Sequence, residues 1–329
     1  MKNNTQKTVL VTGGAGFIGS HLCDRLLNMP EIEKVVCVDN LDPVYPVSLK
    51  KENISVFSGN SKFVFYENDI CDLSAMRDIF EKEKPDYVIN LAAKTDTRAS
   101  VMEPYEHVRV NIIGVLNILE LSKDFRVKRV SLFSSSSVYG NSKATPPFAE
   151  TESTDFPLAP YGATKKAAEV LAYTYFYNHN LPVFCFRLFN VYGERMRPGP
   201  VLSKWTENIF LGKPIELSST KAIRRDFTYV EDVVDALVRS TDENIAGYHI
   251  LNIASSNPAS LVELLNIVEK VSGVKAEVIH RESNKASIEV SHADITKAKE
   301  ILGWEPKTTL EDGVSRYIEW FKKNRLSSN

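Results

Sequence analysis

A glycine-rich turn, Thr12-Gly13-Gly14-Ala15-Gly16-Phe17-Ile18-Gly19, follows the apolar run Val9–Val11 and leads into a helix-forming segment at residues 20–27. Glycines in this position permit a tight turn, a close approach of the backbone to a pyrophosphate, and close packing of helix on strand. The free N–H groups at the start of the helix point at the anion. The pattern predicts a dinucleotide site, with a tight turn that binds no ligand as the alternative.

A carboxylate stands where the ribose of such a dinucleotide needs it. A second apolar run, Val35–Val38, ends in Asp39, twenty residues after Gly19. A carboxylate at this spacing binds the adenosine ribose hydroxyls. Asp39 is followed by Asn40 and Leu41 rather than by an arginine able to hold a 2′-phosphate. We therefore expect NAD rather than NADP as the cofactor.

The bulk composition is that of an ordinary globular protein. The chain has 329 residues, of which 43% are hydrophobic and 25% charged, and its net charge is −2. We therefore expect no nucleic acid and no membrane as partner. The apolar run after the polar segment 1–7 is too short for a signal peptide or a transmembrane helix. The cysteines lack metal-binding spacing, which predicts no metal site and a reducing, cytoplasmic compartment; they are Cys23, Cys37, Cys71 and Cys185.

Strand-like and helix-length segments alternate through the first 190 residues. The expected strands are Val9–Val11, Val35–Val38, Phe63–Tyr66, Tyr87–Leu91, Arg129–Phe133 and Val183–Phe189. Several of these runs are almost continuously apolar, so we expect helices on both faces of the sheet. The predicted fold class is α/β, a Rossmann-type doubly wound parallel sheet with a smaller C-terminal α/β substrate-binding lobe. The expected NAD-binding domain is 1–190, with return segments around 221–255, and the substrate lobe is mainly 191–329.

Tyr161 and Lys165 lie one helical turn apart in a helix-forming run that follows Pro160. A tyrosine has a reference pKa of about 10, so it is a base at neutral pH only if nearby cations stabilise its phenolate. A lysine about 6 Å away, together with an oxidised nicotinamide, supplies enough stabilisation. Four hydroxyls, Ser134–Ser137, end the fifth expected strand, at the edge where an active site is expected. An ordinary Tyr/Lys pair and a polar strand end are the alternatives.

In this order the glycine loop, the serine cluster and Tyr-x-x-x-Lys resemble the extended short-chain dehydrogenase/reductase superfamily, and within it the nucleotide-sugar 4-epimerases. The resemblance covers essentially the whole chain. Further motifs fall in family order, namely Asp39-Asn40-Leu41, Asp69-Ile70, Asn90-Leu91-Ala92-Ala93, Asn111, Arg187–Gly193, Arg225–Val230 and Ala293-Asp294.

The resemblance implies a role for each residue that matches a family motif. Ser135, Tyr161 and Lys165 would be catalytic, with Tyr161 as the base and Lys165 as its electrostatic partner. The cofactor would contact Gly13, Gly16, Phe17, Ile18, Gly19, Asp39, Asn40, Asp69, Ile70, Leu91, Ala92, Ala93, Lys94, Asn111, Tyr161 and Lys165. The substrate would contact Arg98, Ser136, Ser137, Asn190, Arg197 and Arg225. For the three arginines in that set, a surface or structural role is the alternative.

The implied activity is that of a UDP-sugar 4-epimerase that inverts C4 through a transient 4-keto intermediate. Tyr161 would take the proton of the 4-hydroxyl while C4 gives hydride to NAD, which is regenerated in each cycle. Related 4,6-dehydratases carry Asp-Glu in place of Ser136-Ser137, and decarboxylating relatives carry a glutamate at Ser137, so both activities are disfavoured. A net NAD(P)-dependent nucleotide-sugar reductase or dehydrogenase, and a non-catalytic dinucleotide-binding protein, are the alternatives of other classes.

Two segments favour UDP-glucuronate, converted to UDP-galacturonate, as the substrate. Residues 42–50 and Arg195-Met196-Arg197-Pro198 resemble UDP-glucuronate 4-epimerases. Ser136, Ser137 and Arg197 are suited to bind a C6 carboxylate. The usual Arg-Pro-Asp-Met run is here Arg197-Pro198-Gly199-Pro200. Asn190 stands where that subgroup usually has threonine and matches UDP-glucose epimerases, so UDP-glucose and UDP-N-acetylglucosamine stay open.

One departure concerns the nucleotide. The family's Gly-Asp or Gly-Glu before the last motif is here Ala286-Ser287. Arg281 or Lys285 is then the candidate for the phosphate contact.

Two helix-length segments, Pro104–Phe125 and Tyr161–Tyr177, have more apolar residues than one packing face needs. These residues are Val115, Ile118, Leu171, Tyr175 and Phe176. The resemblance implies a homodimer through a four-helix bundle of these segments. The tail, residues 293–323, predicts a short helix, a turn at Gly303–Pro306 and a final amphipathic helix.

Overall fold

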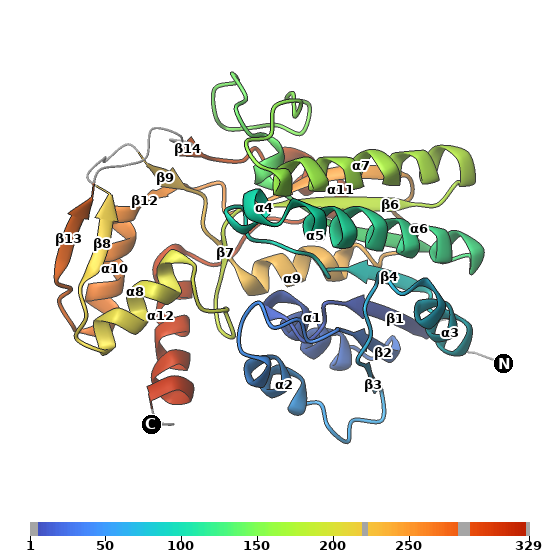
Figure 1. Cartoon of the computed structure of the whole chain (residues 1–329), viewed down its shortest axis with the longest axis horizontal. Coiled ribbons are helices and arrows are strands. Elements are labelled where there is room, and N and C mark those ends of the chain that lie inside the picture. Colours follow the sequence, from blue (N-terminus) through green and yellow to red (C-terminus); the bar gives the residue numbers. More distant parts are fainter. Residues whose placement is uncertain (1–5, 219–222, 282–289, 327–329) are drawn as a thin grey trace.

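Seven parallel strands form the central sheet of the larger part of the molecule (Figure 1). The computed structural model describes residues 6–218, 223–281 and 290–326. The strand order is β11-β6-β5-β4-β1-β2-β3, which confirms the predicted doubly wound sheet. The strands are β1 (Lys7–Thr12), β2 (Ile32–Val38), β3 (Phe63–Tyr66), β4 (Tyr87–Asn90), β5 (Arg129–Ser135), β6 (Val183–Leu188) and β11 (Tyr248–Ile253).

Helices cover both faces of this sheet, and this explains why its strands are apolar throughout. Val9 and Val11 of β1 pack in one hydrophobic cluster, and Leu10 between them packs in the other. The helices on the side of Val9 include α1 (Phe17–Leu27), α2 (Val47–Ser55) and α9 (Val230–Arg239). The helices on the side of Leu10 include α3 (Leu73–Glu83), α6 (Val115–Asp124) and α7 (Pro160–His179).

The predicted helix over Pro104–Phe125 is present but is not a continuous α-helix. It comprises α5 (Pro104–Val108), a π-helical turn η1 (Arg109–Gly114) and then α6, and the short helix α4 (Ala99–Met102) precedes it. π-turns cluster at functional sites, and this one contains Asn111.

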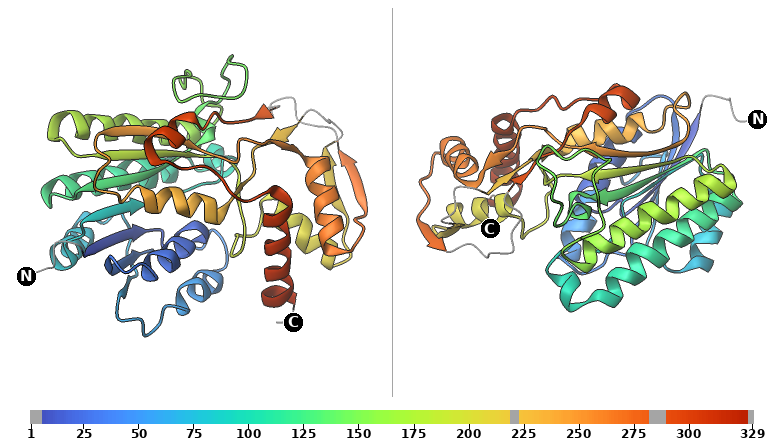
Figure 2. Two further views of the ribbon diagram at one scale, coloured as in Figure 1. Left: turned by 180° about the vertical axis from the view of Figure 1, so that it is seen from behind. Right: turned by 90° about the horizontal axis from the view of Figure 1, so that it is seen from above.

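Most of the apolar residues that we expected to lie outside the packing face of these two helices are buried in the core of the chain itself. Val115, Ile118 and Tyr175 are at most 8% exposed and pack in the cluster under the sheet. Helices α6 and α7 also pack against each other (Figure 2). The hydrophobic side chains that these segments leave exposed are others, namely Tyr105, Val108, Ile113, Val170, Tyr173 and Tyr177.

The C-terminal lobe, on the left of Figure 1, consists of short strands and the helices α8, α10 and α12. Its strands pair as β10-β7, β12-β9-β14 and β13-β8. They are β7 (Val191–Tyr192), β8 (Ile215–Ser218), β9 (Arg224–Arg225), β10 (Thr228–Tyr229), β12 (Ala259–Ser260), β13 (Val278–Arg281) and β14 (Val290–Ser291). The helical elements of the lobe are α8 (Val201–Phe210), α10 (Leu261–Ser272), α12 (Leu310–Phe321) and η3 (Lys322–Leu326). Helix α11 (Thr296–Leu302) packs against β11 of the main sheet. The short helix, turn and final helix predicted for the tail are α11, Gly303–Pro306 and α12.

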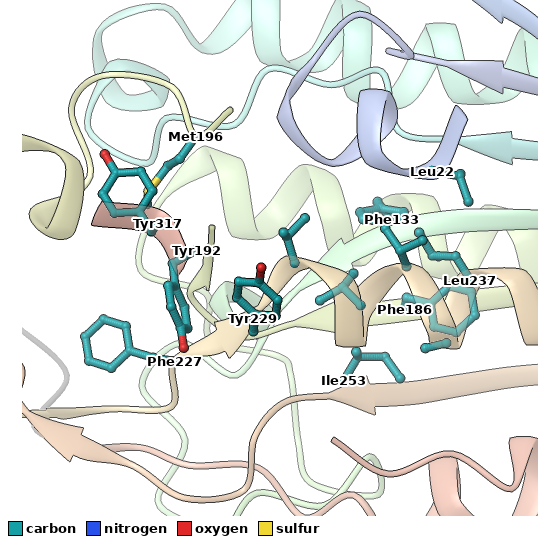
Figure 3. Packing of buried hydrophobic residues seen from close by; sticks show 14 of the residues in the cluster. Leu22, Phe133, Phe186, Tyr192, Met196, Phe227, Tyr229, Leu237, Ile253 and Tyr317 are labelled. Atoms are coloured by element: carbon teal, nitrogen blue, oxygen red, sulfur yellow. The ribbon is translucent and has the colours of Figure 1, made fainter. Parts of the chain in front are cut away.

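One hydrophobic cluster runs from the sheet into the lobe (Figure 3). It joins Leu22 of α1 and Phe186 of β6 to Leu237 of α9, and continues through Met196 to Tyr317 of α12. The two parts therefore share a core, which fixes the cavity between them. Among the described residues, no helix is long and apolar enough to cross a membrane, and no cluster of His, Cys, Asp and Glu is arranged to hold a metal ion.

Candidate active site

A cavity of about 560 Å³ lies at the carboxyl ends of the sheet strands. Its walls include Gly13 after β1, Asp39 after β2 and Ser135 at the end of β5. The segment after β6 closes it from the lobe side with Asn190 and Arg197. Ligands of open α/β sheets bind at this edge, so the cavity is the candidate ligand site.

The glycine loop is shaped as a cradle that side chains would fill. Gly13 has a φ of +67°, and a Cβ there would lie 2.7 Å from the Ala92 nitrogen. A Cβ on Gly19 would lie 2.2 Å from the Gly13 carbonyl oxygen. Only glycine allows these backbone approaches, and they leave the start of α1 open for a pyrophosphate. The residues therefore fit a dinucleotide, with Gly16, Phe17 and Ile18 also lining the cavity.

Asp39 is held in place before any ribose binds. One carboxylate oxygen accepts the Ala15 N–H at 3.2 Å, and the other accepts the Leu41 N–H at 2.8 Å and Lys50 Nζ at 3.3 Å. A carboxylate has about four acceptor positions, so capacity remains for a ribose hydroxyl.

Tyr161, Lys165 and Ser135 meet at the floor of the cavity. Tyr161 hydrogen-bonds Ser135, Ser135 Oγ also accepts the Ser137 N–H at 3.1 Å, and Lys165 Nζ lies 5.9 Å from the centre of the Tyr161 ring. Helix α7 packs so closely on the serine turn that a Cβ on Gly162 would lie 2.6 Å from the Ser137 carbonyl oxygen. The close approach brings the three groups together.

Burial dominates the electrostatics of this triad in the absence of ligand. It raises the pKa of Tyr161, which the hydrogen bond from Ser135 and the charge of Arg197 oppose. Burial lowers the pKa of Lys165 to about 8. Lys165 Nζ donates to the Phe133 carbonyl oxygen at 2.9 Å. At neutral pH the lysine is therefore still mainly charged, and its charge favours the phenolate of Tyr161.

A buried ion pair fixes α7 on the sheet beside this floor. Arg187 of β6 donates from Nε and Nη2 to the two carboxylate oxygens of Glu169, both at 2.8 Å. Ser134 Oγ donates to the same carboxylate at 2.6 Å. The bidentate pair locks β5, β6 and α7 in one register, which positions Ser135 against Tyr161.

The structure brings most of the predicted residues into the cavity wall. Of the predicted set, those that line it are Gly13, Gly16, Phe17, Ile18, Gly19, Asp39, Asn40, Ile70, Leu91, Ala92, Ala93, Ser135, Ser136, Ser137, Tyr161, Lys165, Asn190 and Arg197. The predicted residues outside the wall are Asp69, Lys94, Arg98, Asn111 and Arg225.

Three of the outlying residues are engaged with protein groups. The Asn111 amide donates to the Lys94 carbonyl oxygen at 2.9 Å and to Thr164 Oγ1 at 3.0 Å, and accepts the Lys94 N–H at 2.9 Å. Lys94 Nζ pairs with Asp42 at 2.8 Å. Asp69 pairs with Arg109 at 3.0 Å. Asn111 therefore joins the loop after β4 to helix α7.

The remaining arginines lie apart from the cavity. Arg225 Nη1 donates to the Arg224 carbonyl oxygen at 2.9 Å, and the Arg98 N–H donates to Asp96 at 2.8 Å. Arg281 pairs with Glu216 at 2.8 Å. Lys285 and Ala286-Ser287 lie outside the described residues.

Sequence reasoning missed several side chains of the cavity wall. Tyr45 and Lys50, from the segment after β2, and Thr95 and Thr97, from the segment after β4, all line it. The sequence indicated these residues only by their position after a strand, because segments that follow parallel strands meet at this edge of the sheet.

Comparison with known proteins places this geometry in a family. A family model described as GDP-mannose 4,6 dehydratase matches residues 10–317. The chain is 40% identical over 316 residues to the UDP-glucuronate 4-epimerase of Thermodesulfobacterium geofontis, a match that covers 96% of each chain.

Solved structures are similar over nearly the same length. One is the UDP-glucose 4-epimerase of Thermotoga maritima with UDP-glucose, at 33% identity and a TM-score of 0.86, covering 96% of this chain and 99% of that one. Another, with the same identity, TM-score and coverage, is the UDP-glucuronic acid 4-epimerase of Bacillus cereus in complex with UDP-glucuronic acid and NAD. With these matches and a cradle that fits the dinucleotide, the chain belongs to the NAD-dependent nucleotide-sugar epimerases of the extended short-chain dehydrogenase/reductase superfamily.

Proposed function

We propose that this UDP-sugar 4-epimerase interconverts UDP-glucuronate and UDP-galacturonate. The observation that carries the proposal is Arg197. Its guanidinium lines the cavity, its charge reaches Tyr161, and it forms no ion pair with any described residue. The charge of Arg197 also helps to lower the pKa of Asp96, but no described carboxylate lies within ion-pair distance of Arg197. A half-buried cation of this kind favours an anionic ligand. The C6 carboxylate of a uronic acid is such a ligand.

The proposed chemistry assigns one task to each group on the cavity floor. Tyr161 removes the proton of the sugar 4-hydroxyl, and Ser135 donates a hydrogen bond to the same oxygen. Lys165 stabilises the phenolate through its positive charge. Bound NAD supplies a reversible hydride acceptor for C4. The 4-keto sugar then rotates so that its opposite face is turned toward the hydride donor. Tyr161 returns the proton to the oxygen on C4 when the hydride returns to C4.

Ser136 and Ser137 support an acidic sugar from a second side. Both line the cavity beside Ser135, so their hydroxyls can donate to a carboxylate that Arg197 also contacts. No carboxylate side chain occupies these two positions. These two positions therefore lack the extra acid and base that water elimination needs. The family model that matches the chain is nevertheless described as GDP-mannose 4,6 dehydratase.

Asn190 supports a second candidate substrate, a neutral UDP-hexose. Its side chain lines the cavity and donates to the Asp226 carbonyl oxygen at 3.4 Å. An uncharged amide suits a sugar hydroxyl or an N-acetyl group as well as a carboxylate. UDP-glucose and UDP-N-acetylglucosamine therefore belong in the test.

The test is product analysis by NMR with each of the three UDP-sugars, with and without added NAD. Fastest formation of the galacto-isomer from UDP-glucuronate, without net NADH, is the expected result. An Arg197→Gln variant should lose at least about tenfold in kcat/KM on UDP-glucuronate and change little on UDP-glucose. Equal losses on both sugars, or faster turnover of a neutral sugar by the wild type, would contradict the assignment.

We also propose that residues 1–190, with return segments around 221–255, hold NAD, and that the lobe from 191 to 329 mainly holds the UDP-sugar. Support comes from β11 within the seven-stranded sheet and from Arg197 on the lobe side of the cavity.

The proposed homodimer uses the exposed side of α5, η1 and α7. Apolar side chains there are 45–87% exposed, namely Tyr105, Ile113 and Val170. Large hydrophobic residues exposed on the adjacent elements α5, η1 and α7 are a typical self-association surface. Solution scattering should give twice the chain mass for the wild type and the monomer mass for Tyr105→Glu. A monomeric wild type at micromolar concentration would refute the dimer.

A further inference from the structure

His21 joins helix α1 to the segment that carries Arg197. It lies on the buried face of α1, with 7% of its surface exposed. Its Nε2 is 2.9 Å from the Glu194 carbonyl oxygen. Its Nδ1 is 2.8 Å from Oε1 of Glu231, which lies in the first turn of α9. One imidazole ring therefore links the helix after the glycine loop, the lobe side of the cavity and α9.

Both groups that the ring contacts are hydrogen-bond acceptors. A backbone carbonyl oxygen only accepts, so Nε2 must carry a proton to bond Glu194. A carboxylate only accepts while it is ionised, and Arg25 Nη2 donates to the second carboxylate oxygen of Glu231 at 2.6 Å. Burial raises the pKa of Glu231, but the hydrogen bonds and charges of His21 and Arg25 outweigh it and hold this pKa below its ordinary value. Nδ1 must therefore carry a proton as well, and a ring that makes both contacts is an imidazolium.

Several charged side chains that neighbour the ring have partners other than the imidazole. Asp24, on the next turn of α1, lies 3.7 Å from Arg195 Nη2. The Glu194 carboxylate accepts a tyrosine hydroxyl of β10 at 2.8 Å. Arg25 shares the Glu231 carboxylate with the ring. Glu231 is therefore the group whose charge balances the buried imidazolium, and such pairing is what a buried charge requires.

The segment that the ring contacts is sharply bent and forms part of the cavity wall. Met196 and Arg197 line the cavity. Arg195 has a φ of +59°, in the left-handed region that side chains rarely adopt. Gly193 has a φ of +147°, and a Cβ there would lie 2.5 Å from a side chain of α9. Such a conformation persists only where surrounding contacts hold it, and the bond from His21 to the Glu194 carbonyl oxygen is one of these contacts.

We propose that His21, protonated at both ring nitrogens, is a positioning residue that holds residues 194–197 in the cavity wall and releases them when the ring loses a proton to solvent. The ionised Glu231 is the stronger acceptor and keeps the proton on Nδ1. Nε2 then presents a lone pair to the Glu194 carbonyl oxygen, so an attraction becomes a repulsion. The UDP-sugar must restore the segment when it binds, and its affinity falls as the pH rises. The inference rests on the proposed contact of Arg197 with the substrate, but not on which UDP-sugar the enzyme converts.

The first experiment detects the protons directly. Nitrogen-15 NMR of the NAD-loaded protein, labelled at its histidines, distinguishes an imidazolium from each neutral tautomer. The spectrum of His21→Gln identifies the His21 signals among those of the six histidines. At about pH 7 both ring nitrogens of His21 should carry protons, and at higher pH only Nδ1 should do so. A neutral His21 ring at about pH 7 would overturn the proposal.

The second experiment measures substrate affinity across this titration. Calorimetry gives the Kd values of UDP-glucuronate and UDP-glucose on NAD-loaded protein below and above the pH at which the His21 signals change. The wild type should lose about threefold to tenfold in affinity for each sugar that it binds, which corresponds to one hydrogen bond. His21→Gln, whose side chain does not titrate, should lack this loss. His179→Gln, which replaces an exposed histidine at the end of α7, is the matched control and should behave as the wild type. An equal pH dependence in the wild type and in His21→Gln would overturn the proposal.

Glu231→Gln separates this role from a merely structural one. It keeps the shape of the side chain and removes the charge that stabilises the imidazolium. The NMR transition of His21 and the loss of substrate affinity should therefore move together to lower pH. Movement of the NMR transition alone would show that the ring does not control the cavity wall, and would overturn the proposal. Turnover of UDP-glucose in place of UDP-glucuronate would contradict the proposed substrate and leave these readouts intact, because either sugar serves as the probe.

Discussion

Burial of Lys165 should make the stability of the NAD-free protein depend on pH. The Lys165→Met variant should not show this contribution to the pH dependence. Lys165 is 4% exposed, and its ammonium donates to the Phe133 carbonyl oxygen at 2.9 Å. It forms no ion pair with a carboxylate in the described part of the chain. Burial therefore lowers its pKa to about 8 in the folded state, against about 10.5 in the unfolded chain.

The sign and size of the effect follow from proton linkage. Between about pH 8 and pH 10.5 the unfolded chain binds more protons at this site than the folded protein, so stability rises with pH in that window. At about pH 7 the buried charge costs the folded state about 3 kcal/mol, and at about pH 9.5 the remaining cost is about 1 kcal/mol. The wild type should therefore gain about 2 kcal/mol over this range relative to the methionine variant.

The assay is urea unfolding of NAD-free protein at these two pH values, with tryptophan fluorescence as the measure of unfolding. The difference between wild type and Lys165→Met cancels groups that titrate independently of this site. Tyr161, the close neighbour, stays protonated because burial raises its pKa. Parallel stability curves for the two proteins would refute the inference that Lys165 is held as a strained, partly desolvated cation.

Three further predictions test the geometry of the site. Tyr161→Phe should lower kcat by at least about 100-fold and leave the Kd of NAD unchanged, as measured by isomer formation and calorimetry; near-normal turnover would exclude Tyr161 as the base. Gly19→Ala should abolish NAD binding, because its Cβ would lie 2.2 Å from the Gly13 carbonyl oxygen; normal affinity in titrations would argue against the tight cradle. Glu169→Gln should destabilise the protein by about 3 kcal/mol or more in urea unfolding, because it leaves Arg187 buried without its partner charge; an unchanged midpoint would mean that the pair does not hold α7 on the sheet.

Local patterns in the sequence were sufficient to predict the sheet and the floor of the site. The turn at Gly13–Gly19 and the spacing to Asp39 are short-range features whose backbone geometry admits few alternatives. Tyr161 and Lys165 share a helix face because four residues make about one turn. Contacts of this kind depend on the order of neighbouring residues, so they could be predicted before any tertiary arrangement was known.

The partners of side chains on separate segments could not be predicted in this way. The sequence did not predict that the Asn111 amide contacts Lys94 and Thr164. The apolar residues Val115 and Ile118 were expected to be in excess, yet they are buried in the chain's own core. Packing of the whole fold, including the π-turn before α6, decides which way these side chains point.

Sequence order and spacing therefore determined the fold class and the cofactor, because each is encoded by residues within a few turns or strands of one another. The same local spacing predicts Tyr161 and Lys165 as the catalytic pair. The tertiary structure decided which side chains line the cavity and which of them are already paired there. Tyr45 and Arg197 are far apart in the chain, and only folding brings both to the cavity, while Asp39 is already paired there. Whether a polar group is paired depends on the complete set of surrounding atoms, so it can be determined only when all of those atoms are in place.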